Sequence, residues 1–335
     1  MNSVTILHCV FRETKMKFHQ AFILFFIARF LFARAPVTEN VRFEQRTDGS
    51  LLVDIYYDVS GQDGDSLEIV ISASKDDGVS WTLPCESVSG DVGNGVIPGT
   101  DKHIIWDFYT DNPNLSGNYF KVRITAYGTI QDIDGNRYRV ILIGDRTWMA
   151  ENLRVTHYRN GDPVPEVILG AGWADLATGA YCVYDNNTGN IKPFGFLYNW
   201  FAVADDNHIT PEGWHVPTDE EWKQLEMTLG MSREAADSTD FRGTDEGGQL
   251  KESGTGHWAS PNAGATNATG FSALPGGYRK FDGSFHGMGT HASFWTASED
   301  TTYTAWSRFL SSSTANCFRY SYNKKYVFSI RCVQD

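Results

Sequence analysis

Residues 210–222 constrain the fold most, because they read as a strand that leads directly into a helix with a defined start. Thr218 is predicted to cap this helix, and Glu221, three residues later, completes a capping box. Apolar residues then recur on one helical face, at Trp222, Leu225 and Leu229. Gly230 supplies a stop signal, so we predict a buried structural helix that ends close to it.

Further motifs accompany this segment. They are DIDGN at 132–136, WMAENL at 148–153, GFLYNW at 195–200, GFSALPGGYR at 270–279, FWTASE at 294–299 and FSIRCV at 328–333. On these motifs the chain from about residue 129 to 335 resembles the Fibrobacter succinogenes major paralogous domain. That family is similar in layout to C-type-lectin-like and formylglycine-generating-enzyme-type domains. The resemblance implies an α+β C-type-lectin-like domain at 129–335, in which helices flank twisted antiparallel strands, and it implies no established activity.

Residues 41–127 alternate apolar and polar side chains with a period of two, which predicts strands with one buried face. The clearest run places Leu51, Val53, Ile55, Tyr57 and Val59 on the same side. We therefore expect an all-β sandwich at 37–128, which resembles immunoglobulin-like or fibronectin type III modules. Trp81 and Trp106 are interpreted as core or strand-edge residues. The join at 128–130 is too short for a flexible linker, so the two domains are expected to touch.

The first 35 residues predict an export signal. Two lysines precede a mostly apolar run at 21–32, and Ala33 and Ala35 place small residues where a signal peptidase reads them. A membrane anchor is the alternative, but the run is shorter than the roughly 20 apolar residues that span a bilayer, and Arg29 interrupts it. We expect a mature chain with no membrane-spanning segment that is extracellular, bound at the cell surface or periplasmic.

The net charge disfavours two classes of partner. Residues 1–35 hold five basic residues and one Glu, so their removal changes the formal net charge from −13 to −17. Nucleic acids and anionic membranes are bound through clustered Lys and Arg. We therefore expect no nucleic-acid partner.

Four cysteines follow the export signal, at Cys85, Cys182, Cys317 and Cys332, and an oxidising compartment would permit disulfides among them. The family resemblance implies that the Cys of the final strand bridges to one just before the Pro-x-Gly-Trp segment. Here that region reads His-Ile-Thr at 208–210. Cys332 therefore pairs with Cys182 or Cys317, or stays reduced; we favour Cys182 and expect Cys85 to be unpaired.

The stretch 243–289 is long and dense in Gly, Ser, Thr, Asn and His, as functional loops often are. In C-type-lectin-like folds the long excursion before the last strands carries the ligand surface. That resemblance makes four residues candidates for ligand binding: Trp258, Tyr278, Glu299 and Asp300. Exposed aromatic rings beside carboxylates suit sugars, because sugar faces stack and sugar hydroxyls form hydrogen bonds. The alternative is that these aromatic residues are structural.

The sequence predicts no cofactor and no catalytic residue. Sugar-binding lectins of the resembling fold carry Glu-Pro-Asn or Gln-Pro-Asp and then Trp-Asn-Asp, and these triplets are missing. Calcium stays possible, because Asp132, Asp134 and Asn136 cluster, yet Gly135 follows Asp134 directly, which is typical of a hairpin turn rather than a calcium loop. Common hydrolase and nucleotide motifs do not occur, and His215 is interpreted as a strand residue.

These observations favour an exported, non-catalytic surface or periplasmic binding protein. Its C-terminal domain would recognise a carbohydrate or a protein of the cell envelope. Two alternatives stay open: an enzyme with an unrecognised site at 243–300, and a structural module made for assembly.

Overall fold

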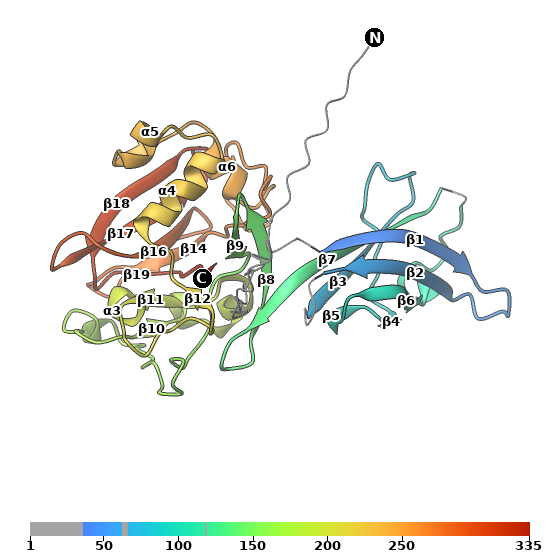
Figure 1. The fold of residues 1–335 in the computed structure, drawn as a ribbon, viewed down its shortest axis with the longest axis horizontal. Helices are drawn as coiled ribbons and strands as arrows, with labels where there is room; N and C mark the ends of the chain where they lie inside the picture. The colour runs from blue at the N-terminus through green and yellow to red at the C-terminus, as the bar shows by residue number, and fades with distance from the viewer. Residues whose placement is uncertain (1–35, 62–65, 118) are drawn as a thin grey trace, which may run out of the picture. The chain divides into compact units, whose positions relative to one another are not determined.

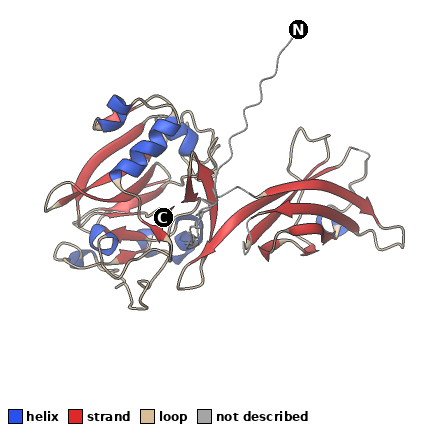
Figure 2. Cartoon of the chain, viewed as in Figure 1, coloured by secondary structure: helices blue, strands red, loops and turns tan. Residues whose placement is uncertain are grey.

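Most of the regular structure in this protein is β-strand. The computed structural model describes residues 36–61, 66–117 and 119–335, and the expected export signal at 1–35 lies outside them. The described residues form three sheets accompanied by few helices (Figures 1 and 2). Across these residues, no helix is both long enough and apolar enough to cross a membrane.

Two layers of antiparallel strands enclose the core of the N-terminal half. One layer has the order β1 (Val37–Gln45), β2 (Val53–Ser60), β6 (Gly99–Trp106) and β4 (Val88–Gly90). The other contains β5 (Gly93–Val96), β3 (Leu67–Ser74) and β7 (Lys121–Gln131), and the short helix α1 (Phe108–Asp111) follows β6. Alternate residues of β2 and β3 are buried between the layers, as the period of two predicts. Trp106 belongs to this core, whereas Trp81 lies partly exposed beneath the Arg123 guanidinium.

The expected boundary between residues 128 and 129 falls inside a single strand, β7. Its first eight residues pair with β3, and its last four pair with β8 (Arg137–Ile143) in a hairpin. The sheet then continues through β9 (Arg146–Met149) and β20 (Val333–Gln334) to β12 (Trp214–His215). The described residues therefore form one compact unit, although the N-terminal half keeps its own hydrophobic cluster.

The turn of the β7–β8 hairpin contains the acidic residues that resembled a calcium loop. The Asp132 carboxylate accepts hydrogen bonds from the backbone N–H groups of Asp134, at 3.0 Å, and Asn136, at 2.9 Å. It also accepts one from the Tyr138 hydroxyl, at 2.6 Å. The interpretation of this segment as a hairpin is thus confirmed, and the Asp132 oxygens are used within the turn.

A large mixed sheet organises the C-terminal half. Its strands, in order, are β10 (Tyr181–Cys182), β11 (Leu197–Asn199), β19 (Val327–Phe328), β14 (Gly276–Arg279), β16 (His291–Glu299), β17 (Thr304–Ser311), β18 (Cys317–Asn323) and β13 (Asp240–Arg242), and β15 (Phe285–Met288) pairs with β14. The remaining helical segments are short: η1 (Gly170–Gly172), η2 (Tyr184–Asn186), η3 (Thr188–Asn190), α2 (Ile191–Phe194), α3 (Trp200–Val203), α5 (Arg233–Asp237) and α6 (Glu246–Leu250). Long stretches of this half therefore have no regular secondary structure, yet side chains from them, such as Trp258 and Phe271, are buried in the core.

The predicted capped helix is α4 (Asp219–Thr228). Thr218 accepts a hydrogen bond from the backbone N–H of Glu221, and the Glu221 carboxylate accepts one from the backbone N–H of Thr218, so the capping box is complete. Trp222 and Leu225 are buried against the sheet, and the helix ends with Leu229 as its C-cap. The capping box and the buried face of this helix are therefore confirmed.

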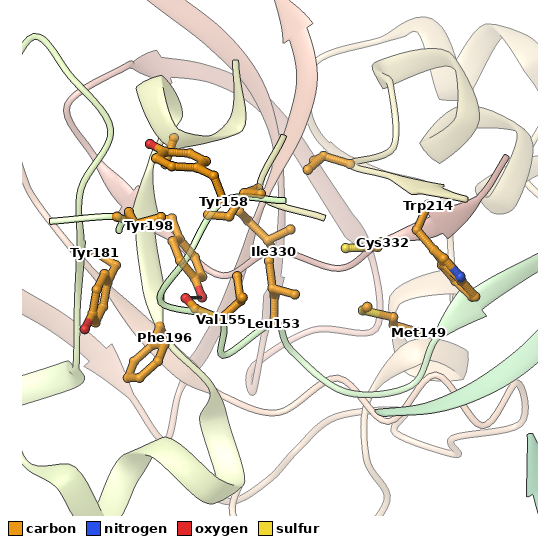
Figure 3. Packing of buried hydrophobic residues seen from close by; sticks show 14 of the residues in the cluster. Met149, Leu153, Val155, Tyr158, Tyr181, Phe196, Tyr198, Trp214, Ile330 and Cys332 are labelled. Atoms are coloured by element: carbon orange, nitrogen blue, oxygen red, sulfur yellow. Dashed lines mark hydrogen bonds between the residues drawn. The ribbon is translucent and has the colours of Figure 1, made fainter. Parts of the chain in front are cut away.

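Segments that are distant in the sequence meet in the core beside β9. Met149 and Leu153 pack with Ile330, Cys332 and the aromatic ring of Tyr198 in one cluster (Figure 3). Met149 is the last residue of β9 and Leu153 follows it, whereas Ile330 and Cys332 precede β20. The cluster therefore joins the beginning of the C-terminal half to its end.

The expected Cys182–Cys332 disulfide is not formed. Cys332 lies in the cluster of Figure 3, whereas Cys182 lies in a different one with Trp173. All four cysteines of the described residues are free thiols. Burial raises the pKa of the Cys182 thiol to about 12, and it raises that of Cys332 further, so both thiols are protonated packing groups.

His215 is a half-buried strand residue held between two carboxylates. Its Nδ1 lies 2.6 Å from Asp335 and its Nε2 lies 3.0 Å from Glu221, and the hydrogen bond to Glu221 is the main cause of its raised pKa.

The raised pKa of His215 makes the stability of the protein depend on pH. A group whose pKa is raised on folding stabilises the folded state below its unfolded pKa, about 6.5, and loses that contribution as pH rises through the folded pKa. We expect His215→Gln to flatten the stability profile between pH 6 and 8, as measured by urea unfolding. An NMR titration of His215 at or below pH 6.5 would contradict this.

Candidate functional site

Trp258 is a core residue, which corrects the expectation that it forms a binding face. It is 1% exposed and packs in the cluster that contains Trp222. Its indole N–H donates to the Ala273 carbonyl at 2.9 Å, and the Lys251 ammonium lies 5.4 Å from its ring centroid. The long segment folds back onto the sheet and buries the ring, so Trp258 is not available to a ligand.

Glu299 and Asp300 lie where β16 turns into β17, and both side chains have partners within the protein. The Glu299 carboxylate forms an ion pair with the Lys324 ammonium, which also lies over the Trp200 ring. Asp300 accepts a hydrogen bond from the Thr304 hydroxyl, at 3.2 Å. Asp300 therefore helps to close this hairpin, and Glu299 links it to the turn that follows β18.

Tyr278, the fourth candidate, belongs to a closed circuit of aromatic rings. We define the aromatic face as Tyr278, His291, Phe309, Phe318, Tyr320, Tyr322 and Tyr326. Neighbouring ring centroids around this circuit are between 4.4 and 6.4 Å apart. The seven residues come from β14, β16, β17, β18 and the turn before β19. The structure thus brings together one residue that the sequence singled out and six that it did not.

Strand register explains why these rings share one side of the sheet. Phe309 is opposite Phe318, and Ser307 is opposite Tyr320, so alternate residues of β17 and β18 point the same way. The intervening residues, including Arg308, point to the other side, where Arg308 meets Glu226 of α4. α4 covers that other side, whereas on the aromatic side Trp200 of the short helix α3 packs in one cluster with Tyr278 and Tyr322. The rings of the aromatic face nevertheless stay partly exposed, Tyr320 to 45%.

Three residues of the aromatic face, Tyr278, Phe309 and Tyr322, line a small hollow. Ser293, Ser307 and Phe328 are among its lining residues, and its volume is about 10 Å³, about the space of a single water. The Ser307 hydroxyl donates to the Tyr320 carbonyl at 2.9 Å. The Ser293 hydroxyl is 2% exposed by residue and has no hydrogen-bond partner within the described residues. A buried hydroxyl without a partner is costly, so a donor or acceptor that reached this hollow would be stabilised.

The aromatic face is electrically neutral near pH 7. Burial raises the pKa of Tyr322 to about 12 and also raises the pKa values of Tyr278 and Tyr326. Burial lowers the pKa of His291, which keeps its imidazole uncharged. The face therefore offers ring surfaces and neutral hydroxyl groups, a combination that suits an uncharged, hydroxyl-bearing ligand better than an ion.

Sequence reasoning missed most of the aromatic face. Phe318, Tyr320 and Tyr322 alternate with polar residues in β18, and this pattern predicts one shared side. The pattern does not show whether that side is buried or exposed, which depends on contacts with other elements. The described residues contain no group of three or more His, Cys, Asp or Glu side chains that could hold a metal ion.

Comparison with known proteins identifies the C-terminal half. The sequence model of the Fibrobacter succinogenes major domain matches residues 141–334. Because this match covers more than half of the chain, the protein belongs to that family. No curated protein and no solved structure matches the chain.

Proposed function

We propose that this protein is an exported, non-catalytic binding protein of the cell surface, the extracellular space or the periplasm, and that its aromatic face binds carbohydrate. The observation that carries this proposal is the closed circuit of partly exposed, uncharged rings, three of which line a small hollow that also holds the Ser293 hydroxyl, unpartnered within the described residues. Sugar rings stack their apolar faces on such aromatic surfaces, and their hydroxyls pair with tyrosine and serine hydroxyls. The acidic net charge does not oppose a neutral ligand.

The proposal includes a finer assignment of the two halves. We assign the C-terminal half to a C-type-lectin-like α+β fold, supported by antiparallel strands β16–β18 with α4 against one side. We assign the N-terminal half to an immunoglobulin-like or fibronectin type III-like sandwich, supported by its two antiparallel layers around one core. The N-terminal half would then present the C-terminal half to its ligand.

The packing of residues 251–275 supports binding rather than catalysis. Lys251 is fully buried, and its ammonium donates to the carbonyls of Ala263, Ser311 and Thr314 at 2.8–2.9 Å. Burial lowers the pKa of Lys251 to about 8, but three backbone acceptors use all its donors. Lys251 therefore holds residues 251–275 against the sheet, and its ammonium has no free donor for a catalytic role.

A glycan array followed by titration in solution tests the proposed function. We expect the mature chain to bind one class of neutral glycan, and Tyr320→Ala with Tyr322→Ala to weaken that binding about tenfold or more, because each lost stacking contact is worth about 1 kcal/mol. Calcium and chelator arms establish any dependence on that ion.

Tyr303→Ala is the matched control, since Tyr303 is 75% exposed and lies outside the aromatic face. It should leave binding unchanged, and thermal melts should confirm that all variants fold. Unaltered affinity in the double variant would contradict the proposal. Chemical turnover of a bound glycan would favour an enzyme, and self-association that the double variant abolishes would favour an assembly module.

A further inference from the structure

A second concave surface of different chemistry borders β8. It is a cleft of about 690 Å³, which is within the range of small-ligand sites, and most of its lining comes from residues 137–331. We call it the basic cleft, for the cations that line it: Arg137, Arg139, Arg154, Lys192 and Arg331. A concentration of positive side chains is unexpected in a chain whose formal net charge is −13.

Two of these cations are neutralised by carboxylates. Arg139 forms two hydrogen bonds to Glu68, at 2.5 and 2.8 Å. Arg154 donates to Glu151 at 3.0 Å, and its guanidinium also stacks over the Tyr138 ring. These four residues therefore form the frame of the cleft and contribute little net charge to it.

The other three cations have no carboxylate partner among the described residues. Arg137 donates through Nη1 to the Ser66 hydroxyl at 3.0 Å, which leaves most of its guanidinium donors available. Lys192 is exposed in α2 and makes no ion pair within the described part of the chain. Arg331 is 1% exposed, and its guanidinium donates to the Asn152 side chain and to backbone carbonyls. None of these acceptors is charged, so they do not neutralise the positive charge of Arg331.

The remaining acid and neutral groups of the cleft do not cancel this charge. Glu252 lies 2.9 Å from His257, and its single negative charge is smaller than the combined charge of Arg137, Lys192 and Arg331. Ser272 and Asn267 lie in the same lining, where the Asn267 amide donates to the Ser272 hydroxyl at 2.8 Å. The second amide N–H of Asn267 is left for a sugar hydroxyl. The cleft thus combines two available cations, a buried uncompensated cation and neutral hydrogen-bonding groups.

We propose that the basic cleft binds an oligosaccharide that carries carboxylate groups. A guanidinium matches a carboxylate in shape and charge, and an ammonium adds a second attraction that can be satisfied by the next acidic sugar. The cleft is large enough for more than one sugar ring, and its neutral groups suit the hydroxyls. The basic cleft differs from the aromatic face in its residues and in its charge. A failure of one of the two binding proposals would therefore not contradict the other.

Calorimetric titration with trigalacturonate tests this proposal, with the fully methyl-esterified trimer as a ligand of similar shape but no charge. We expect the mature chain to bind the acid at least tenfold more tightly than the ester at low ionic strength. Added salt should weaken binding of the acid, because salt screens exposed charges. We expect the double variant Arg137→Gln with Lys192→Ala to bind the acid at least tenfold more weakly.

Lys75→Ala is the matched control, because it removes an exposed lysine that does not line the cleft. It should not change the affinity, and the variant with Tyr320→Ala and Tyr322→Ala should still bind the acid. The proposal is overturned if trigalacturonate does not bind at low salt, if the ester binds equally well, or if Lys75→Ala weakens binding as much as the cleft variant does.

Discussion

Trp222→Ala should lower the free energy of unfolding of the C-terminal half by about 3–5 kcal/mol, the usual cost of deleting a buried aromatic side chain. Trp222 is 1% exposed, and its ring lies 5.3–5.7 Å from the rings of Trp148, Phe271 and Phe294. These neighbours come from β9, the long segment and β16, so one cavity would loosen three elements. Urea unfolding followed by near-ultraviolet circular dichroism measures the loss.

Two further variants separate volume from other effects. Gln224 lies on the exposed side of α4, so Gln224→Ala should change stability by less than about 0.5 kcal/mol. Trp222→Phe should cost less than Trp222→Ala, because the Trp222 indole N–H is buried without a partner in the described part of the chain. A Trp222→Ala protein that unfolds like the wild type would show that this ring does not anchor α4.

Local sequence signals predicted the elements whose stability depends on near neighbours. The start of α4 was predictable, because Thr218 and Glu221 are three residues apart and satisfy each other's backbone N–H groups. The buried side of β2 was predictable from its period of two, except that Leu51 lies in a turn with φ of 60° and is 43% exposed. Both successes rest on spacings of two to four residues.

The candidate site depended on contacts that spacing alone does not reveal. The alternation of Phe318, Tyr320 and Tyr322 predicts that they share one side of β18, but not which side α4 covers. That choice follows from the ion pairs between α4 and the other side of the sheet. The prediction that Trp258 is exposed was wrong for the same reason, because its burial depends on how residues 251–275 fold back over β16 and β17.

The family resemblance predicted the extent of the C-terminal domain correctly but not the state of its cysteines. It located the domain within about 12 residues of the match at 141–334. The family's usual disulfide did not transfer, since its partner position is occupied by residues 208–210 and the alternative, Cys182, lies in another cluster. In this chain Cys332 is held in the core by packing rather than by a disulfide.

Glu226→Gln should destabilise the C-terminal half by about 3–5 kcal/mol, because it removes the charge that balances two buried arginines. Glu226 is fully buried and accepts hydrogen bonds from Arg308 at 2.8 Å and from Arg242 at 2.7 Å. Arg308 and Arg242 are 1% and 5% exposed, so water cannot replace the lost carboxylate. Glutamine preserves the side-chain volume, and the measured loss in urea unfolding therefore reports charge.

The double variant Glu226→Met with Arg242→Met distinguishes a cost of unpaired charge from general disruption. Replacing both partners of a buried ion pair by apolar residues is often nearly neutral, so the double variant should be more stable than Glu226→Gln. Glu220→Gln, on the exposed side of α4 beside Arg233, should cost less than about 0.5 kcal/mol. Equal losses in the single and double variants would argue against a charge network under α4.

Acid should weaken the same network through Asp219, which accepts hydrogen bonds from Arg308 at 2.7 Å and from Arg319 at 2.8 and 2.9 Å. Burial alone would raise the Asp219 pKa, but these two guanidinium groups hold it well below its usual range. A carboxylate whose pKa is lowered on folding stabilises above its unfolded pKa, about 4, and loses this contribution as pH falls toward the folded pKa. Asp219→Asn should therefore be less stable than the wild type at pH 7, and the difference should shrink below pH 4. A difference that stays constant from pH 7 to pH 2.5 would place the role of Asp219 in packing rather than in its charge.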